Sequence, residues 1–405
     1  MKTDVLVIGA GAAGMAAAIA AAKRNLKVVI AERDEITGGI LNQCIHNGFG
    51  LHYFREELTG PEYAERFREQ LSRYAGSIEV LTDCHVLKLD RNKKALLVSP
   101  KNVFELEAKV VVYAAGARER PFGSLMIPGD RPSGIFTAGV AQRLMNIDNR
   151  KVGRKALIVG SGDIGMIMAR RLTLEGIEVV GVVERLPYPG GLLRNVIQCL
   201  KDFNIPLYLS STVVEVKGSE RLEEVVVARV DEQFRPIPGT EKSFKVDTLV
   251  LSVGLIPQVE MLNGLVTLDK RTRGIACSNT GQSSNEWIFA AGNCTAVFDL
   301  VDYVTKEGER AGEYASRYVN GERFSLGVPI VPGENVMLTF PNYYNDVDDL
   351  TLYLRCKKPM EKALLKVGGF EKTFEDLIPS EMIVVKIPKQ KLSNLDRIEV
   401  KLEEV

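Results

Sequence analysis

The hydrophobic pattern opens with a short apolar run at residues 5–8, which a glycine-rich turn and an Ala-rich segment at residues 15–23 follow. Apolar runs of this length are typical of parallel strands buried on both faces, and Ala has the highest intrinsic helix propensity. A second apolar run, residues 27–31, ends at Glu32. The order predicts strand, turn, helix and strand, which is the βαβ unit of a parallel sheet.

The same order of elements returns in the middle of the chain. Residues 156–159 form an apolar run, residues 166–175 are predicted to form a helix, and residues 178–183 form another apolar run that ends at Glu184. Each of the two turns carries three glycines in a G-x-G-x-x-G pattern, namely Gly9, Gly11 and Gly14, and Gly160, Gly162 and Gly165. In such a fingerprint the glycines permit a tight turn, close approach of a pyrophosphate and close helix packing, and the acid binds ribose hydroxyls. Two fingerprints with matching strands, helices and acids predict two dinucleotide-binding folds.

The remaining pattern divides into an α/β part and a C-terminal β part. Helices are predicted at residues 59–74, 137–146 and 301–319, and strands at residues 79–90, 94–98, 109–114, 205–217, 223–230, 243–245, 248–252 and 286–290. After residue 321, Pro329, Pro332 and Gly333 indicate a linker. The segments beyond it that alternate like strands are residues 336–340, 350–355, 382–387 and 397–402.

Composition narrows the function classes. The 405 residues carry 52 Lys+Arg and 52 Asp+Glu, a balance that argues against nucleic acid or an anionic membrane as the main partner. No apolar run approaches the ~20 residues of a membrane span, and the N-terminus lacks a secretory pattern, so we expect a cytoplasmic protein. The six cysteines include no Cys-x-x-Cys, and there are three histidines, so no metal site is predicted.

Four segments together resemble a known group: the two fingerprints with their acids, residues 111–116, and residues 287–293. They are similar to the two-dinucleotide-domain flavoproteins of the glutathione-reductase structural group. The resemblance implies an α/β fold with two Rossmann-like domains, the NAD domain inserted in the FAD domain, and a small β-rich C-terminal domain. The implied domains are residues 1–120 and 259–325 for FAD, 121–258 for NAD, and 326–405 for the C-terminal domain.

The resemblance also assigns cofactor residues. FAD would bind at Gly9, Gly11, Ala13, Gly14, Glu32, Arg33, Gly39, Ile40, Asn42, Val86, Ala115, Gly116, Gly292, Asn293, Val301 and Asp302. NAD would bind at Gly160, Gly162, Asp163, Ile164, Gly165, Glu184, Arg185 and Gly254. Asn293 stands where the group usually has Asp, and an amide can still bond a hydroxyl. The helix after it would direct its N-terminus to the flavin, with Asp299 as its cap.

Glu184 bears on the choice of nicotinamide. A carboxylate pairs with a 2′-hydroxyl and repels a 2′-phosphate, so NAD is favoured over NADP. The adjacent Arg185 argues in the other direction, because an arginine can meet a 2′-phosphate.

A narrower resemblance rests on residues 38–50, 114–121, 299–303 and 307–309. These segments look like the flavoprotein subunits found beside FAD-dependent glycerol-3-phosphate dehydrogenase, which are related to NAD-binding subunits of amino-acid dehydrogenases. The resemblance implies electron transfer between NAD and a partner flavin dehydrogenase subunit, in a homo- or hetero-oligomer.

Cys44 and His52 are the catalytic candidates. Disulfide reductases of the group carry two redox cysteines four residues apart after the Gly-Gly, whereas this chain has Ile40 and Leu41 before Cys44. Cys44 would serve a peroxidase, oxidase or mixed-disulfide reductase, or it is a buried small residue. His52 would relay protons beside the flavin, or it is a surface histidine. A non-enzymatic flavin-bearing subunit is a further interpretation.

Two other groups have open interpretations. Arg118, Glu119 and Arg120 favour a salt-bridged turn over a substrate clamp. Phe340, Tyr343 and Tyr344 would form either an interface patch or the core of the C-terminal unit.

Overall fold

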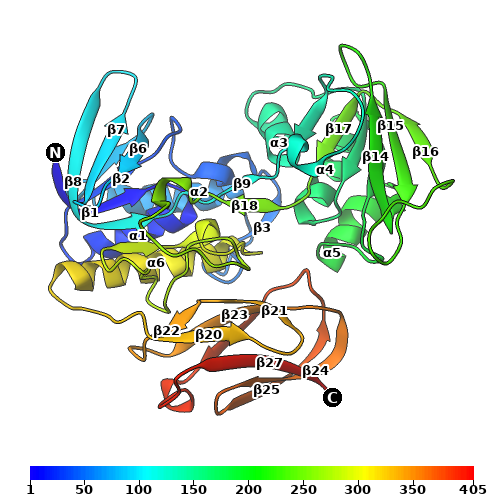
Figure 1. Ribbon diagram of the computed structural model, residues 1–405. Coiled ribbons are helices and arrows are strands. Elements are labelled where there is room, and N and C mark those ends of the chain that lie inside the picture. The colour runs from blue at the N-terminus through cyan, green and yellow to red at the C-terminus, as the bar shows by residue number, and fades with distance from the viewer. The chain divides into compact units, whose positions relative to one another are not determined.

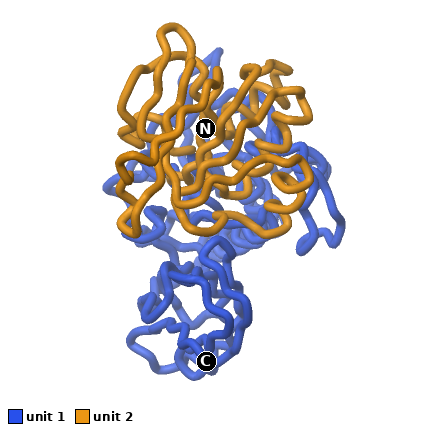
Figure 2. Tube along the Cα trace, turned by 90° about the vertical axis from the view of Figure 1, so that its right-hand side faces the viewer, with its two compact units in different colours: residues 1–118, 257–405 blue, residues 119–256 orange.

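The computed structural model describes residues 1–405 (Figure 1). The chain forms two compact units, of which the first comprises Met1–Arg118 with Pro257–Val405 and the second Glu119–Ile256 (Figure 2). Each unit contains a pair of parallel strands, and a fingerprint turn follows the first strand of the pair. The predicted α/β class, with one Rossmann-like domain inserted in another, is therefore confirmed.

The first unit is built on a mixed sheet of seven strands. β1, β2, β5 and β19 run parallel to their neighbours, and β6 and β7 add an antiparallel edge to β8. The strands are β1 (Lys2–Ile8), β2 (Val28–Ala31), β5 (Ile78–Leu81), β6 (His85–Leu89), β7 (Lys94–Val98), β8 (Val103–Tyr113) and β19 (Ile288–Ala290). The helices are α1 (Ala12–Ala22), α2 (Gly60–Ser72) and α6 (Val301–Val319). The helix predicted at residues 301–319 is confirmed without change of bounds.

Smaller elements connect these. They are η1 (Gly39–Gln43), β3 (Asn47–Phe49), β4 (Leu58–Thr59), η4 (Glu260–Leu262) and η5 (Gly292–Cys294). The α2 helix begins where its sequence predicts, because the Thr59 side chain and the Glu62 side chain each cap the other's backbone N–H.

The α1 and α6 helices pack at very short range. A Cβ added to Gly308 would lie 2.3 Å from the carbonyl oxygen of Ala13, and one added to Gly312 would lie 2.2 Å from that of Ala17. Only glycine on α6 and alanine on α1 permit this approach. The fingerprint helix α1 is thereby held directly against α6.

The second unit has a five-stranded parallel sheet and a three-stranded antiparallel sheet. The parallel sheet runs β10 (Ile135–Thr137), β17 (Thr248–Leu251), β11 (Lys155–Val159), β12 (Glu178–Val183) and β13 (Leu207–Tyr208). The antiparallel sheet is β14 (Ser211–Lys217), β15 (Glu224–Arg229) and β16 (Lys242–Lys245). Helical elements are η2 (Phe122–Leu125), α3 (Ala138–Asn146), α4 (Asp163–Leu174), α5 (Leu193–Asn195) and the π-helical η3 (Val196–Lys201). β9 (Ala117–Glu119) and β18 (Leu255–Pro257) lie where the chain changes units.

The C-terminal part of the first unit is β-rich, as predicted. One sheet comprises β22 (Tyr343–Tyr344), β20 (Val328–Pro332), β27 (Ile398–Glu404), β24 (Met360–Val367) and β25 (Phe370–Leu377). The other comprises β21 (Val336–Phe340), β23 (Leu350–Cys356) and β26 (Ile383–Ile387), and η6 (Lys389–Lys391) completes the elements. This part has its own apolar core, which includes Tyr344. Phe340, Tyr353 and Met382 belong instead to the apolar core around the seven-stranded sheet.

The interpretation as core of the C-terminal unit is correct for Tyr344, whose side chain is buried there. Phe340 is also buried but belongs to the other core, and Tyr343 is half-buried. No helix has both the length and the apolar character that crossing a membrane requires.

Candidate functional site

The two fingerprint turns share one geometry, in which the outer glycines are crowded and the middle glycine faces open space. Gly9 and Gly160 both have φ of +97°. A Cβ on Gly9 would lie 2.6 Å from the Ala114 oxygen, and a Cβ on Gly14 would lie 1.8 Å from the Gly9 oxygen. A Cβ on Gly11 would meet no atom within 4 Å. The space beside Gly11, at the N-terminus of α1, is the cradle that a pyrophosphate requires.

The second turn repeats this arrangement. A Cβ on Gly160 would lie 2.0 Å from the Ser252 oxygen. A Cβ on Gly165 would lie 2.2 Å from the Gly160 oxygen. Gly162, which precedes α4, has open space beside it. Both turns therefore fit the phosphates of a dinucleotide.

The glutamate that follows the second strand of each βαβ unit is hydrogen-bonded to the fingerprint turn of the same unit. Glu32 is buried and accepts hydrogen bonds from the N–H groups of Ala10 (2.6 Å) and Asp34 (2.9 Å). Glu184 is also buried and accepts hydrogen bonds from the N–H groups of Ser161 (2.9 Å) and Leu186 (3.0 Å). The backbone donors fix the position of each carboxylate beside its cradle.

A polar network closes the second turn. The Ser161 hydroxyl donates to Glu184 (2.7 Å) and accepts from the Gly190 N–H (2.8 Å). Asp163, the first residue of α4, accepts from the N–H of Leu192 (2.8 Å) and the side chain of Asn195 (2.6 Å). Sequence reasoning missed Ser161 and Asn195, and the short helix α5 begins at Leu193.

The segment after the first acid folds back over Gly11. A Cβ on Gly39 would lie 3.4 Å from the Gly11 Cα, so this turn borders the cradle. Ile40 is 62% exposed, which leaves an apolar surface where the flavin is predicted. The Asn42 side chain donates to the Thr37 carbonyl (3.1 Å) and accepts from Arg68 (3.2 Å), so it also fixes this turn.

The late segment brings η5 and the start of α6 to α1. A Cβ on Gly292 would lie 3.1 Å from the Ala13 Cβ, and the Asn293 side chain accepts from the Phe298 N–H (3.2 Å). The prediction that Asp299 caps α6 is wrong, because Leu300 is the N-cap residue and no side chain caps it. Asp299 instead pairs with Arg355 and accepts from the Met382 N–H (2.6 Å).

The other predicted cofactor residues lie at the ends of strands or at the first turns. Val86 on β6 is buried next to Cys84, whose N–H donates to the Glu32 carbonyl (2.8 Å). Gly116 and Gly254 have positive φ and open space beside them. Arg33, Ala115, Ile164, Arg185 and Val301 are exposed or half-buried. The Arg185 guanidinium lies over the Phe234 ring at 5.2 Å.

Cys44 is buried, with 5% of its surface exposed. It ends η1, and its carbonyl accepts from the N–H of Gly60, the first residue of α2 (2.9 Å). A Cβ on Gly60 would lie 2.9 Å from the Cys44 Cβ, so the cysteine lies at the start of α2. All six cysteines are buried and none forms a disulfide.

His52 lies at the N-terminal end of α6. Its ring stacks on Tyr303 with 6.3 Å between centroids and 17° between planes. The adjacent Tyr53 N–H donates to the Asp302 carboxylate (3.1 Å). Burial raises the Tyr303 pKa, and the negative charges of Asp299, Asp302 and Glu381 raise it further. The structure thus places the predicted His52, which is exposed, and the unpredicted Tyr303 together at the N-terminal end of α6.

Arg118 pairs with Glu260 (2.9 Å), which agrees with the salt-bridged interpretation.

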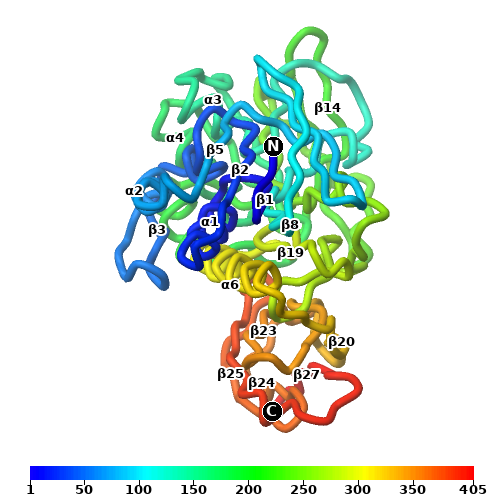
Figure 3. The backbone as a smooth tube through the Cα atoms, turned by 90° about the vertical axis from the view of Figure 1, so that its left-hand side faces the viewer, coloured from blue at the N-terminus to red at the C-terminus, as the bar shows by residue number.

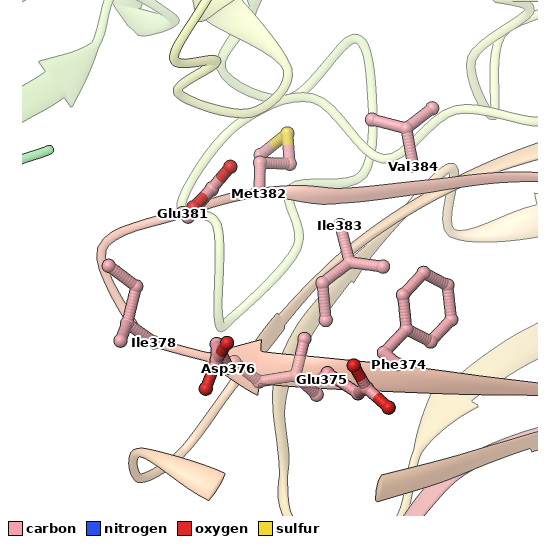
Figure 4. Close-up of a pocket in the computed structure, with 9 residues that line it drawn as sticks. Phe374, Glu375, Asp376, Ile378, Glu381, Met382, Ile383 and Val384 are labelled. Carbon is pink, nitrogen blue, oxygen red and sulfur yellow. The ribbon is translucent and has the colours of Figure 1, made fainter. Parts of the chain in front are cut away.

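A separate hollow of about 200 Å³ lies between the end of β25 and the start of β26 (Figure 4). Its lining includes Glu375, Asp376, Glu381 and Met382, and Met382 is the residue whose N–H donates to Asp299. Figure 4 shows the carboxylates of Asp376 and Glu375 on one strand and that of Glu381 in the loop before the other strand.

The fold and the two phosphate cradles define a protein that binds two dinucleotides. Residues 3–310 match the family described as pyridine nucleotide-disulphide oxidoreductase, and the chain belongs to that family. It is an FAD-dependent pyridine nucleotide oxidoreductase that binds FAD and NAD(P)H.

Known relatives support the same assignment. The chain is 28% identical over 318 residues to hydrogen cyanide synthase subunit HcnB of Pseudomonas aeruginosa, covering 73% of this chain and 67% of that one. It is 25% identical over 326 residues to thioredoxin reductase of Mycolicibacterium smegmatis, covering 79% and 96%. Among solved structures, T. acidophilum thioredoxin reductase shares the fold with a TM-score of 0.65 and 22% identity, covering 79% of this chain and 99% of that one.

Proposed function

We propose that the protein moves electrons between NAD and a partner flavin dehydrogenase through its bound FAD. In this proposal residues 1–120 and 259–325 bind FAD, residues 121–258 bind NAD, and residues 326–405 form the C-terminal domain. Bound FAD supplies the chemistry by exchanging a hydride with the nicotinamide. Glu184, which accepts hydrogen bonds from two backbone N–H groups, gives the preference for NAD over NADP.

The state of the cysteines carries the proposal. A dithiol reductase needs two neighbouring thiols, at least one of them accessible as a thiolate. Every cysteine of this chain is buried, and the segment of Cys44 contains no second cysteine. The electron acceptor or donor on the second side of the flavin is therefore expected to come from outside the chain.

The names of two relatives support the proposal that the chain works beside a partner subunit. Hydrogen cyanide synthase subunit HcnB and sarcosine oxidase subunit alpha of a Corynebacterium are, by their names, subunits of larger enzymes. A flavin dehydrogenase of the glycerol-3-phosphate type fits the sequence resemblance, but neither of these relatives is named for that substrate. That partner stays a prediction.

The proposal assigns a separate role to each group of residues at the two cofactor sites. The N–H groups at the starts of α1 and α4 bind pyrophosphate, and Glu32 and Glu184 bind ribose hydroxyls. The N–H groups of Val301 and Asp302 face the flavin and favour negative charge there. His52 and Tyr303 lie at the same helix end, where either side chain can hold a proton during reduction.

Anaerobic titration of the purified protein with NADH, and separately with NADPH, tests the proposal. We expect NADH to bleach the flavin absorbance rapidly and NADPH to do so much more slowly. Activity with an artificial dye acceptor should follow the same preference. Absence of bleaching with both nucleotides would contradict the proposal.

A second candidate function is an NADH-dependent peroxidase, oxidase or disulfide reductase that uses Cys44. The observation in its favour is the position of Cys44 at the start of the 13-residue α2 helix, because a helix N-terminus stabilises a thiolate. The Cys44→Ser variant separates the two. Under the leading proposal its dye reductase activity is unchanged, and under the alternative its peroxide or disulfide reduction disappears.

A further inference from the structure

The α6 helix lies between α1 on one side and strand β23 of the C-terminal domain on another (Figures 1 and 3). The α1 side is the close glycine–alanine contact described above. The β23 side is polar and aromatic. The two sides together determine where the N-terminal end of α6 is held.

Every second residue of β23 contacts a residue of α6 or of the segment just before it, and these contacts follow one another along the helix. Thr351 accepts from Arg310 (2.9 Å), and the Tyr353 hydroxyl donates to Glu307 (2.9 Å). Arg355, two residues further on, pairs with Asp299 just before the helix begins. Because side chains alternate along a strand, these three residues share one face of β23. The strand therefore runs beside α6 in the opposite direction, with Arg355 at the flavin-facing end.

The Asp299–Arg355 pair also binds a loop of the C-terminal domain. Arg355 donates to the carbonyls of Ser380 (2.6 Å) and Pro379 (3.3 Å), and Asp299 accepts from the Met382 N–H (2.6 Å). The side chains of Arg355 and Asp299 are only 13% and 15% exposed. The loop that carries Glu381 on one side of the hollow (Figure 4) is thus bound to Asp299, two residues before α6 begins.

The charged side chains in the contact between α6 and β23 are largely buried, and each has a partner of opposite charge. Glu307 is 4% exposed and is satisfied by Arg310 (2.7 Å) and by Tyr353. Phe298 packs edge-to-face on Tyr353 with 5.1 Å between centroids, and Tyr303 lies 5.6 Å from the same ring. Removing one partner of a buried pair leaves the other uncompensated. The contact is therefore specific in register and resists sliding of the strand along the helix.

We propose that β23 fixes the flavin-facing end of α6, with Arg355 and Tyr353 as positioning residues for the flavin site. This inference rests on the proposed placement of FAD at the N–H groups of Val301 and Asp302. Under it, the C-terminal domain holds the positive end of the α6 dipole where the charge of reduced flavin develops. Loosening the contact makes reduction of the flavin less favourable.

The reduction potential of FAD in the full-length holoprotein, measured against reference dyes under chemical reduction, tests the inference. For Arg355→Met we expect the ratio of reduced to oxidised flavin, at a fixed dye ratio, to fall by about twofold to fivefold, since that matches the usual size of a helix-dipole interaction. Arg355→Lys, which keeps the charge, should restore part of the shift. Thr351→Val, on the same face but opposite the middle of α6, should leave the potential unchanged.

A variant Arg355→Met with a lower melting temperature but an unchanged potential would overturn the inference, since the contact would then be structural only. If Arg355→Met does not fold, Tyr353→Phe decides, because it removes only the hydroxyl that binds Glu307. It should shift the potential in the same direction, and an unchanged potential would again overturn the inference. Chemical reduction needs no nicotinamide, so this result is independent of whether NADH reduces the flavin.

Discussion

The Glu184 carboxylate accepts two hydrogen bonds from Ser161, one from its N–H at 2.9 Å and one from its hydroxyl at 2.7 Å. Ser161 is the residue between the first two glycines of the second fingerprint. The acid that we propose to select the ribose is therefore held by the same turn that we propose to bind the phosphates. Under this proposal, rigid placement of the charge makes it an effective barrier to a 2′-phosphate.

Glu184→Gln should shift nucleotide preference toward NADPH. The amide keeps the size of the side chain and one acceptor for Ser161 but removes the charge that repels a phosphate, while Arg185 remains. We expect the ratio of kcat/KM for NADPH over NADH to rise about tenfold, equivalent to ~1.4 kcal/mol. Steady-state dye reduction with each nucleotide measures this ratio. Glu178→Gln, on the same strand with a 63% exposed side chain, is the control, and an equal shift in both variants would refute the role of Glu184.

Alanine at the middle glycine of each fingerprint should separate cofactor binding from folding. Gly11→Ala and Gly162→Ala place a methyl group in open space, so both proteins should fold with melting temperatures close to that of the wild type. Gly11→Ala should lose FAD, because the methyl group occupies the phosphate cradle. Gly162→Ala should keep FAD and lose reduction by NADH.

Flavin content by absorbance and the NADH titration report the two losses separately. Gly14→Ala is the contrasting variant, since its Cβ would lie 1.8 Å from the Gly9 oxygen, and it should fail to fold. Full flavin content in Gly11→Ala would show that the first cradle does not bind FAD.

The sequence predicted the parts of this fold that depend on local patterns. The fingerprints, the acids and the α6 helix have short-range signals, and the structure places them as expected. The C-terminal hairpin β24–β25 was missed because its strands are rich in Lys and Glu, although Gly368–Gly369 between two alternating segments is itself a hairpin signal. The role of Asp299 was also missed, because its partner Arg355 is distant in sequence and no local pattern indicates the pair.

The candidate site, too, could be predicted from the sequence only where its contacts are local. Ser161 could have been found from its place inside the fingerprint, because a hydroxyl there can reach the following acid. Tyr303 and His52 meet only because loop 50–57 packs on the start of α6, which requires the Tyr53 N–H to bond Asp302. Contacts of this kind depend on tertiary structure.

Gly308→Ala should destabilise the first unit. The added Cβ would lie 2.3 Å from the Ala13 oxygen, so α1 and α6 must separate. Such overpacking costs about 1–3 kcal/mol, which exceeds the gain of ~1 kcal/mol in helix propensity. Urea unfolding of the holoprotein measures the change. Gly76→Ala, whose Cβ would meet no atom within 4 Å, is the matched control, and equal stability of the two variants would contradict the close packing of the helices.

Asp302→Asn should change how stability depends on pH. Asp302 is 1% exposed, and burial raises its pKa above the ordinary value of 3.8, against the lowering effect of the His52 and Tyr53 N–H groups. The folded state therefore binds this proton more tightly than the unfolded state does. The contribution of Asp302 to stability is complete below pH 3.8 and is lost as the pH rises through the folded pKa.

An asparagine does not titrate, so the stability of the wild type minus that of Asp302→Asn should fall with rising pH above 3.8 and then become constant. Taking this difference cancels the titration of every other carboxylate that the two proteins share. Denaturant unfolding of both holoproteins, in steps from about pH 4 upward, measures it. A difference that rises with pH would mean that the folded protein lowers the pKa of Asp302, and that its N–H donors outweigh its burial.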